Sequence, residues 1–254
     1  HSGAAVDREK ANFRDVVTQY DAECERVVAE TVLAHFPHHT FLGEESVGAG
    51  AAASVAALSE KLAAGGEEEP MLWIVDPIDG TTNFAMGLPL AAVSVGVVHR
   101  GRVVAGVVYH PALDECFAAA RGAGAFCNGR PLAPRRAPAL GEAVVNVGFP
   151  PAPAALAACM RGLAAVRAEV RGLRMLACAS LGLAWVADGR LSAYFSYDLN
   201  AWDLAAGLLL LEEAGAVMTD LRGAPAGVGT RHMLAAGGAG LHAAVLARLR
   251  AAGA

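Results

Sequence analysis

The chain has 254 residues, of which 55% are hydrophobic, and a formal net charge of −5. This length and composition allow a sizeable core and exclude intrinsic disorder. No block of lysine and arginine is long enough for a nucleic-acid surface, and the uncharged apolar runs fall short of the ~20 residues that a membrane span needs. We therefore expect neither a nucleic-acid partner nor a membrane.

The five cysteines form no CxxC pair. The sequence therefore predicts free thiols instead of a zinc site or a disulfide framework, and free thiols fit a reducing compartment. We accordingly expect a soluble intracellular protein. The sequence leaves open whether it acts in the cytoplasm or in a plastid stroma.

The first part of the chain predicts a helix, a strand and an acidic turn. Apolar residues recur at roughly helical spacing over 16–36, and Pro37 ends that helix. Residues 40–46 predict a short strand that leads into the turn Gly-Glu-Glu-Ser. Residues 47–70 are rich in glycine and alanine, with one short helix over 55–62. We interpret 47–70 as a solvated excursion without chemistry.

Residues 73–84 form the most informative stretch. Trp73-Ile74-Val75 predicts a buried strand that Asp76-Pro77 ends, because proline lacks the N–H that a sheet ladder needs. Gly80-Thr81-Thr82 predicts the start of a helix, whose free N–H groups are suited to an anion. Asp76 and Asp79, at the end of a strand, cannot both be buried without a cation. Carboxylates beside an anion site indicate metal-assisted phosphate chemistry.

The remaining chain divides into an antiparallel part and an alternating part. Strand-like runs at 90–98, 103–109, 115–120 and 124–127 predict a meander that the turn Asn128-Gly129 closes. After it the expected strands are 143–149, 169–175, 191–195, 216–219 and 232–236, and the expected helices are 154–167, 178–188, 203–214 and 239–251. This alternation predicts an α/β second half with a layered sheet.

A stretch rich in proline and arginine, 131–138, is the best candidate boundary in the chain. It predicts two halves, 1–138 and 139–254, within one compact unit.

Three acidic sites together indicate a metal site more strongly than any one of them alone. Asp203 opens a helix, where an isolated aspartate is typically a cap. Glu44-Glu45 alone is typical of a solvated turn, and a lone DxxD is common. Acidic residues at two strand ends and one helix start, one of them fused to a Gly-Thr-Thr turn, favour a shared metal site.

The sequences GEES at 43–46, WIVDPIDGTTNF at 73–84 and WDLAAG at 202–207, in this order, resemble the inositol monophosphatase family. The resemblance covers nearly the whole chain. It implies a layered αβαβα sandwich of the inositol monophosphatase and fructose-1,6-bisphosphatase type, commonly a homodimer. The implied activity is Mg²⁺-dependent, lithium-sensitive hydrolysis of a small phosphomonoester. The family also carries a helix ahead of the Lys10 region, for which this sequence leaves almost no residues.

The resemblance also implies a ligand set. Glu44, Asp76 and the Ile78 carbonyl would hold the first Mg²⁺, Asp76, Asp79 and Asp203 would hold the second, and a third, weaker ion would lie near Glu44 and Glu45. These are the hard oxygen ligands that Mg²⁺ prefers.

For the reaction, the implied phosphate-binding groups are Gly80, Thr81 and Thr82. Thr81 and Glu44 would orient the attacking water, and Asp21 matches an aspartate that supports the threonine. Lys10 occupies the position at which members of the family carry a lysine that assists near the metals. A solvated surface lysine is the alternative interpretation of Lys10.

The alcohol-binding positions, Ala179, Ser196 and Asp198, depart from the family. Ala177-Cys178-Ala179 replaces a Gly-Thr/Ser-Ala turn, and Ser196 stands where inositol-specific members carry a glutamate. Asp198 is a candidate for the missing carboxylate. The expected substrate is a small phosphorylated polyol, with inositol 1-phosphate as first choice. The alternatives are histidinol phosphate, galactose 1-phosphate, fructose 1,6-bisphosphate, a 3′-phosphonucleotide, or a non-catalytic scaffold that binds a partner.

Overall fold

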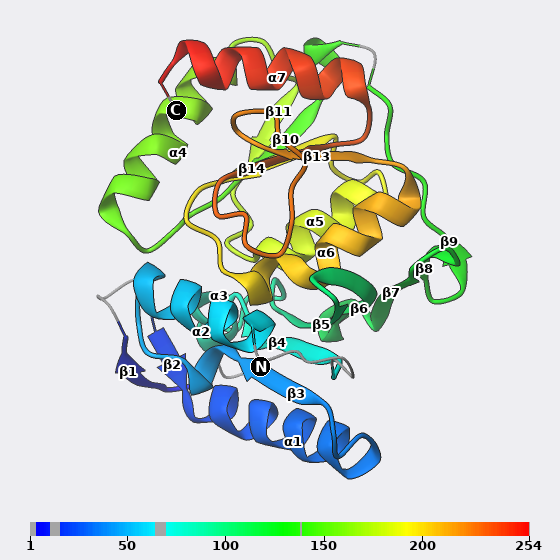
Figure 1. Ribbon diagram of the computed structural model, residues 1–254. Helices are drawn as coiled ribbons and strands as arrows, with labels where there is room; N and C mark the ends of the chain where they lie inside the picture. The colour runs from blue at the N-terminus through cyan, green and yellow to red at the C-terminus, as the bar shows by residue number, and fades with distance from the viewer. Residues whose placement is uncertain (1–3, 11–15, 64–69, 138, 254) are drawn as a thin grey trace.

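Helices and sheets are stacked in five layers, in the order αβαβα, in the computed structural model (Figure 1). The structure describes residues 4–10, 16–63, 70–137 and 139–253. Residues 64–69 of the predicted excursion and residue 138 of the predicted boundary lie outside this description. The layered α/β sandwich predicted from the sequence is confirmed.

The larger sheet has seven strands in the order β3-β4-β5-β6-β7-β8-β9. Their bounds are β3 (Thr40–Gly43), β4 (Leu72–Asp79), β5 (Ala92–His99), β6 (Arg102–His110), β7 (Glu115–Ala120), β8 (Gly124–Cys127) and β9 (Arg130–Pro131). β3 and β4 are parallel and the remaining pairs are antiparallel. Asn128 and Gly129 both have positive φ, as a two-residue hairpin turn requires, so the predicted turn is confirmed.

The strand β4 does not end at Asp76, as the sequence suggested, but continues through Pro77 to Asp79. Its register against β5 shifts between Asp76 and Asp79, and the Ile78 N–H donates to Asp76 Oδ1 at 3.1 Å. Proline is tolerated at such a bulge. In a regular strand, residues three apart point to opposite faces. The bulge breaks that alternation, so both aspartates line the same cavity.

The smaller sheet has five strands in the order β11-β10-β12-β14-β13. Their bounds are β10 (Val144–Val147), β11 (Gly172–Arg174), β12 (Ala193–Ser196), β13 (Val217–Asp220) and β14 (Met233–Ala236). β10 is parallel to both its neighbours, and the other pairs are antiparallel. Helices α4 (Pro153–Val166) and α7 (Ala239–Ala251) cover its outer face.

Helices α5 (Ala179–Ala187) and α6 (Ala201–Ala214) form the middle layer between the sheets. Both are apolar on nearly all sides, as expected of a helix buried between two sheets. A single core cluster joins Val108 of the larger sheet with Leu183 of α5 and Leu204 of α6. Since helices of the second half complete the core of the first, we propose that 1–138 and 139–254 fold as one unit.

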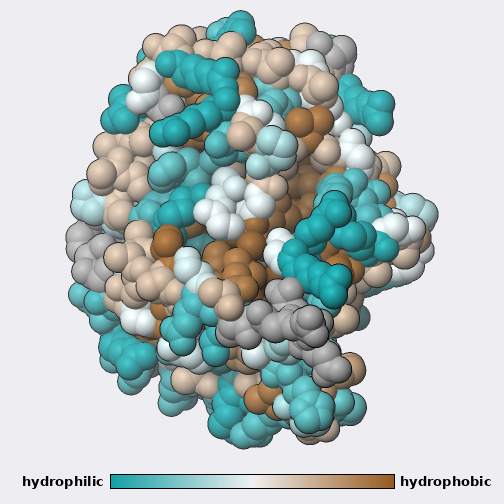
Figure 2. All heavy atoms as spheres, viewed as in Figure 1, coloured by the Kyte–Doolittle hydropathy of each residue, from teal (hydrophilic) through white to brown (hydrophobic). Residues whose placement is uncertain are grey.

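The helix α1 (Gln19–His35) covers the outer face of the larger sheet, whereas α2 (Ala51–Ala63) lies on the other side of β3 and β4, beside the cavity described below. Thr18 caps α1, accepting a hydrogen bond from the Tyr20 N–H, and is the last residue of β2 (Val16–Thr18), which pairs antiparallel with β1 (Val6–Glu9). Short α3 (Thr81–Ala85) follows β4. None of the helices in the described part of the chain combines the length and hydrophobicity that crossing a membrane requires. Strongly hydrophobic side chains on the viewed face gather in a hollow near the middle of the molecule (Figure 2).

Candidate active site

A cavity of about 1030 Å³ lies at the end of β4 and is lined by residues of both halves of the chain. From the first half come the acidic turn after β3, the β4 bulge and the start of α3. From the second half come the segments ahead of α4 and α5 and the start of α6. Every predicted site residue except Asp21 and Glu45 lines this cavity.

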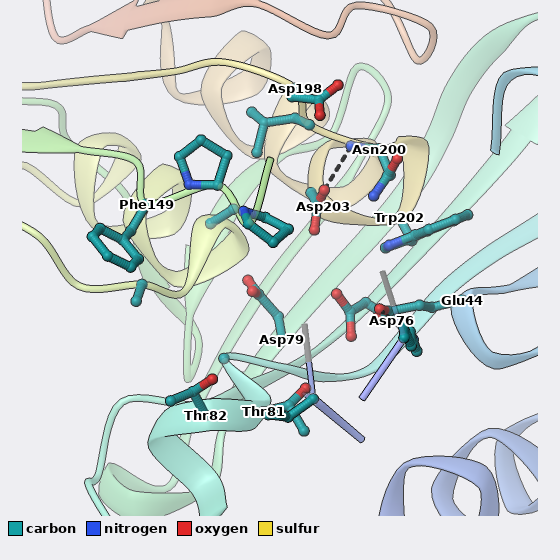
Figure 3. Close-up of a pocket in the computed structure, with 18 of the residues that line it drawn as sticks. Glu44, Asp76, Asp79, Thr81, Thr82, Phe149, Asp198, Asn200, Trp202 and Asp203 are labelled. Carbon is teal, nitrogen blue, oxygen red and sulfur yellow. Dashed lines mark hydrogen bonds and ion pairs between the residues drawn. The ribbon is translucent and has the colours of Figure 1, made fainter. Parts of the chain in front are cut away.

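Three carboxylates meet inside this cavity (Figure 3). Asp76 and Asp79 extend from the β4 bulge toward Asp203, which projects from the first turn of α6. One oxygen of each lies within 4.8 Å of the others. Asp76 is 2% exposed and Asp79 is 7% exposed, and no lysine, arginine or histidine of the described residues forms an ion pair with any of the three. The arrangement therefore concentrates negative charge that nothing in the described chain neutralises.

Burial raises the pKa of Asp76 and Asp203 well above the usual range, and repulsion from the neighbouring carboxylates adds to the effect. Burial also raises the pKa of Glu44, to about 7, although Lys10 opposes the shift. The ionised form of each group is unfavourable unless a cation binds, because charge is costly in a dry site. The site therefore favours either protons or a metal ion.

Lys10 lies at this site, so its alternative interpretation as a solvated surface residue is wrong. Its side chain is 12% exposed, and its Nζ is 2.8 Å from both Glu44 Oε1 and Glu45 Oε1. Burial acts to lower the pKa of Lys10, but these ion pairs outweigh burial and hold the pKa above its usual value. A permanently charged ammonium therefore lies between Glu44 and Glu45, where the resemblance implied a third ion.

Thr81 and Asp21 are brought together across 60 positions of sequence. The Thr81 Oγ1 lies 3.2 Å from Asp21 Oδ1 and 3.0 Å from the Ile78 carbonyl oxygen, and its single proton is donated to one of them at a time. Asp21 is itself held by the N–H and hydroxyl of Thr18, which donate to its Oδ2 at 2.8 and 2.6 Å. The Thr81 hydroxyl is therefore held between the first turn of α1 and the end of β4.

The turn at Gly80 depends on glycine. Its φ of +88° is left-handed, and a Cβ there would lie 2.7 Å from the Leu90 carbonyl oxygen. Any other residue would be strained and would displace this neighbouring backbone. Gly80 thereby starts α3 directly after Asp79, with Thr81 and Thr82 on the cavity (Figure 3).

Two residues that the sequence analysis did not single out hold this motif in place. The Ser180 N–H and hydroxyl donate to Asp79 Oδ2 at 2.5 and 2.6 Å, and the Asn83 side chain donates to the carbonyl oxygens of Leu90 and Leu176 at 2.8 and 2.7 Å. Ser180 lies in the first turn of α5, where backbone N–H groups lack helical partners. That position was the available signal, but its partner Asp79 lies 101 positions away.

The expected alcohol-binding residues all line the cavity, but they differ in the contacts that their side chains already make. Ala179, the first residue of α5, and Ser196 are both buried. The Ser196 hydroxyl donates to the Tyr197 carbonyl oxygen at 3.4 Å. Asp198 accepts from Arg231 Nε at 3.1 Å and from Nη2 at 2.5 Å. The Asp198 carboxylate lines the cavity but is already neutralised.

The contacts of Arg231 show that the interpretation of residues 47–70 as an excursion without chemistry needs correction, because part of this segment belongs to the cavity. The Nη1 of Arg231 donates to Ser54 Oγ of α2 at 3.0 Å, and Ser54 lines the cavity together with residues 47–51. The helix α2 is longer than predicted and forms part of the cavity wall. No local sequence pattern indicates this role, because the contact with Arg231 spans 177 positions.

Comparison with known proteins gives one consistent result. The family model described as the inositol monophosphatase family matches residues 2–254. The inositol-1-monophosphatase of Rhizobium meliloti is 41% identical over 214 residues, covering 82% of this chain and 73% of that protein. The Nus factor SuhB of Salmonella typhimurium is 36% identical over 220 residues, covering 86% of this chain and 77% of that protein.

Among solved structures, the extragenic suppressor protein suhB from Bartonella henselae superimposes with a TM-score of 0.84 at 33% identity. The match covers 97% of this chain and 90% of that one.

Proposed function

The chain belongs to the inositol monophosphatase family, and from this premise we propose that it hydrolyses a small phosphorylated polyol in a Mg²⁺-dependent reaction, with inositol 1-phosphate as the first substrate to test. The observation that carries the proposal is the group of Asp76, Asp79 and Asp203 beside the Gly80-Thr81 turn, the first two buried and Asp203 half-buried, with no ion-pair partner among the described residues. The inositol-1-monophosphatase relative supports the choice of substrate.

The residues present fit a hard divalent cation. They offer carboxylate and carbonyl oxygens only, and the raised pKa values of Asp76 and Asp203 mean that the site gains most from a positive ion. Glu44, Asp76 and the Ile78 carbonyl would hold one Mg²⁺, and Asp76, Asp79 and Asp203 a second. When bound, these ions would neutralise phosphoryl charge and lower the pKa of water.

The other groups act on the water and on the phosphate. Asp21 accepts the Thr81 hydroxyl proton, which leaves an oxygen lone pair of Thr81 to accept a hydrogen bond from the attacking water. Glu44, which lines the same cavity, accepts from the same water. The N–H groups at the start of α3, from Gly80 to Thr82, bind the phosphate oxygens. These roles derive from the family resemblance together with the observed positions.

Mg²⁺ is expected to stabilise the folded protein. A ligand that binds only the native state adds RT ln(1 + [Mg²⁺]/Kd), which is about 1.4 kcal/mol at a tenfold excess over Kd. For a chain of this size the expected rise in Tm is roughly 3–6 °C. Thermal melting at increasing Mg²⁺ measures it, with Ca²⁺-free, EDTA-treated protein as the reference. A Tm that does not change up to tens of millimolar Mg²⁺ would count against the metal site.

The same melting curves should depend on pH in a defined direction. Glu44 has a raised pKa of about 7 against an ordinary 4.5, so its protonation favours the folded state. Without metal, that stability is present below pH 4.5 and is lost as the pH rises through about 7. The gain from Mg²⁺ should grow over this interval, because the ion binds the ionised carboxylate. A gain from Mg²⁺ that shrinks as the pH rises would contradict the assignment of Glu44.

Inositol 1-phosphate is expected to be cleaved with an elevated KM and little preference over glycerol 2-phosphate. Ser196 is uncharged, and Asp198 is already paired with Arg231. Losing a charge-assisted hydrogen bond typically costs about 1.5–3 kcal/mol, or roughly tenfold to a hundredfold in affinity. The kcat/KM values for both substrates, in the wild type and in Ser196→Glu, measure this. A wild type that strongly prefers inositol 1-phosphate and is not improved by Ser196→Glu would refute it.

A non-catalytic role is the second candidate, because the relative from Salmonella typhimurium is named as a Nus factor. Retention of every carboxylate of the implied ligand set supports catalysis over this alternative. Phosphate release from a generic phosphomonoester with Mg²⁺, against an EDTA control, decides between the two. Release only with Mg²⁺ supports the phosphatase, whereas no release from any member of a substrate panel supports the scaffold.

The homodimer implied by the resemblance is a separate prediction, which light scattering can test.

A further inference from the structure

The helix α1 presents two buried carboxylates one helical turn apart, Asp21 and Glu25. They are 1% and 6% exposed. Asp21 reaches Thr81, as described above. Glu25 reaches a different part of the cavity wall, the turn Glu44–Ser46 that follows β3. The family resemblance assigned no role to Glu25.

Glu25 uses both carboxylate oxygens on this turn. Its Oε2 accepts from the backbone N–H of Glu45 at 2.8 Å, and its Oε1 accepts a short hydrogen bond from the Ser46 hydroxyl. The Glu45 N–H follows Glu44 directly and Ser46 follows Glu45, so both hydrogen bonds hold the turn that carries these two side chains. A carboxylate that accepts two hydrogen bonds in a buried position restrains both partners strongly.

The sequence of the turn accommodates this contact. A Cβ on Gly43 would lie 2.2 Å from the Glu25 carboxyl carbon and from Oε2. Since real Cβ atoms do not approach so closely, glycine at position 43 is required for Glu25 to reach the Glu45 N–H. Gly43 has an ordinary extended conformation, so space at Glu25, and no backbone constraint, explains the glycine.

We propose that Glu25 is a positioning residue that fixes the Glu44–Ser46 turn and thereby sets the affinity of the metal site. The inference rests on the proposed function, since Glu44 is one of the expected metal ligands. Without Glu25, repulsion between the carboxylates of Glu44 and Asp76 would be opposed mainly by the ion pairs that Lys10 and the exposed Arg8 form with the turn. Loss of this restraint weakens metal binding, while the bound geometry stays attainable at saturating metal.

The test compares Mg²⁺ binding, measured by calorimetry and by the Mg²⁺ dependence of Tm, in the wild type and in Glu25→Ala. We expect the Kd for Mg²⁺ to rise about tenfold to a hundredfold in the variant, as for other residues that orient metal ligands. The matched control is Glu30→Gln on the same helix, because Glu30 is exposed and pairs only with Arg26 among the described residues. An unchanged Kd in Glu25→Ala, even with a lower Tm in the absence of metal, would show a structural role alone and overturn the proposal.

Gly43→Ala tests the same contact without removing Glu25, and a double-mutant cycle joins the two changes. Gly43→Ala in the wild type should weaken Mg²⁺ binding, because its methyl group displaces the Glu25 carboxylate. In the Glu25→Ala background the same change should have little further effect, since the obstructed group is gone. Equal effects in both backgrounds would contradict the inference. Glu25→Gln keeps one oxygen acceptor for the Glu45 N–H and should give an intermediate Kd.

The wild type separates the two levels of the argument. If it binds Mg²⁺ and hydrolyses phosphomonoesters but Glu25→Ala binds the ion equally well, only the role of Glu25 is wrong. If the wild type does not bind Mg²⁺, the proposed metal site is wrong, and the inference about Glu25 falls with it.

Discussion

Replacing Asp79 by asparagine is expected to lower kcat by at least about a hundredfold, since even residues that only support metal ligands cost 10–100-fold when changed. Asp79 Oδ2 accepts two hydrogen bonds from Ser180. In the variant, the amide oxygen must face the Ser180 N–H, because an NH₂ group cannot accept. The NH₂ group then turns toward the cavity, where it opposes a cation and donates to the neighbouring carboxylates.

The fold of Asp79→Asn should be intact. One buried negative charge is removed from a group of three, so repulsion falls and Tm without metal should equal or exceed that of the wild type. The rise in Tm with Mg²⁺ should be lost at the same time. Asp114→Asn serves as the control, because Asp114 is exposed and bonds to Tyr109. Near-normal turnover, or an unfolded protein in the absence of metal, would contradict the assignment of Asp79 as a metal ligand.

Thr81→Ala is expected to lower kcat by roughly 10²–10⁴-fold with little change in KM, the range typical of a positioned acid–base group. The hydroxyl would contact the attacking water mainly in the transition state, so its loss should affect turnover more than binding. Steady-state kinetics on the folded variant measure the two constants separately.

The structure argues against an ordinary capping role for Thr81. Gly80 occupies the cap of α3, and the Thr81 hydroxyl bonds to Asp21 and Ile78 with no bond to a helix N–H. Loss of a capping residue would cost about 0.5–2 kcal/mol of stability and little rate. Thr81→Ser keeps the hydroxyl and should retain most of the activity. A Thr81→Ala variant with an unchanged kcat would favour a purely structural role.

The sequence by itself determined the order and type of nearly all elements, because the signals that specify them are local. Hydrophobic runs located the strands of both sheets, and Asn128-Gly129 located a hairpin. It also indicated the acidic residues that meet at the cavity, since the chemistry of a carboxylate at a strand end or helix start can be recognised without the fold.

The strand β4 shows where local signals misled. Pro77 predicted the end of the strand, yet the chain continues in a bulge that turns Asp76 and Asp79 toward one cavity. A bulge is a property of pairing with the neighbouring strand, so the single strand does not encode it visibly.

Only the tertiary structure decided which side chains are free to act. Lys10 is paired with Glu44, and Asp198 is paired with Arg231, whereas Asp203 faces the cavity without a cation partner among the described residues. The hydrogen bonds that join Glu25 to the turn Glu44–Ser46 and Ser180 to Asp79 were likewise decided by the tertiary structure. Each of these contacts joins residues 20 to 101 positions apart, so its energy depends on how the layers pack and not on any pattern in the neighbouring sequence.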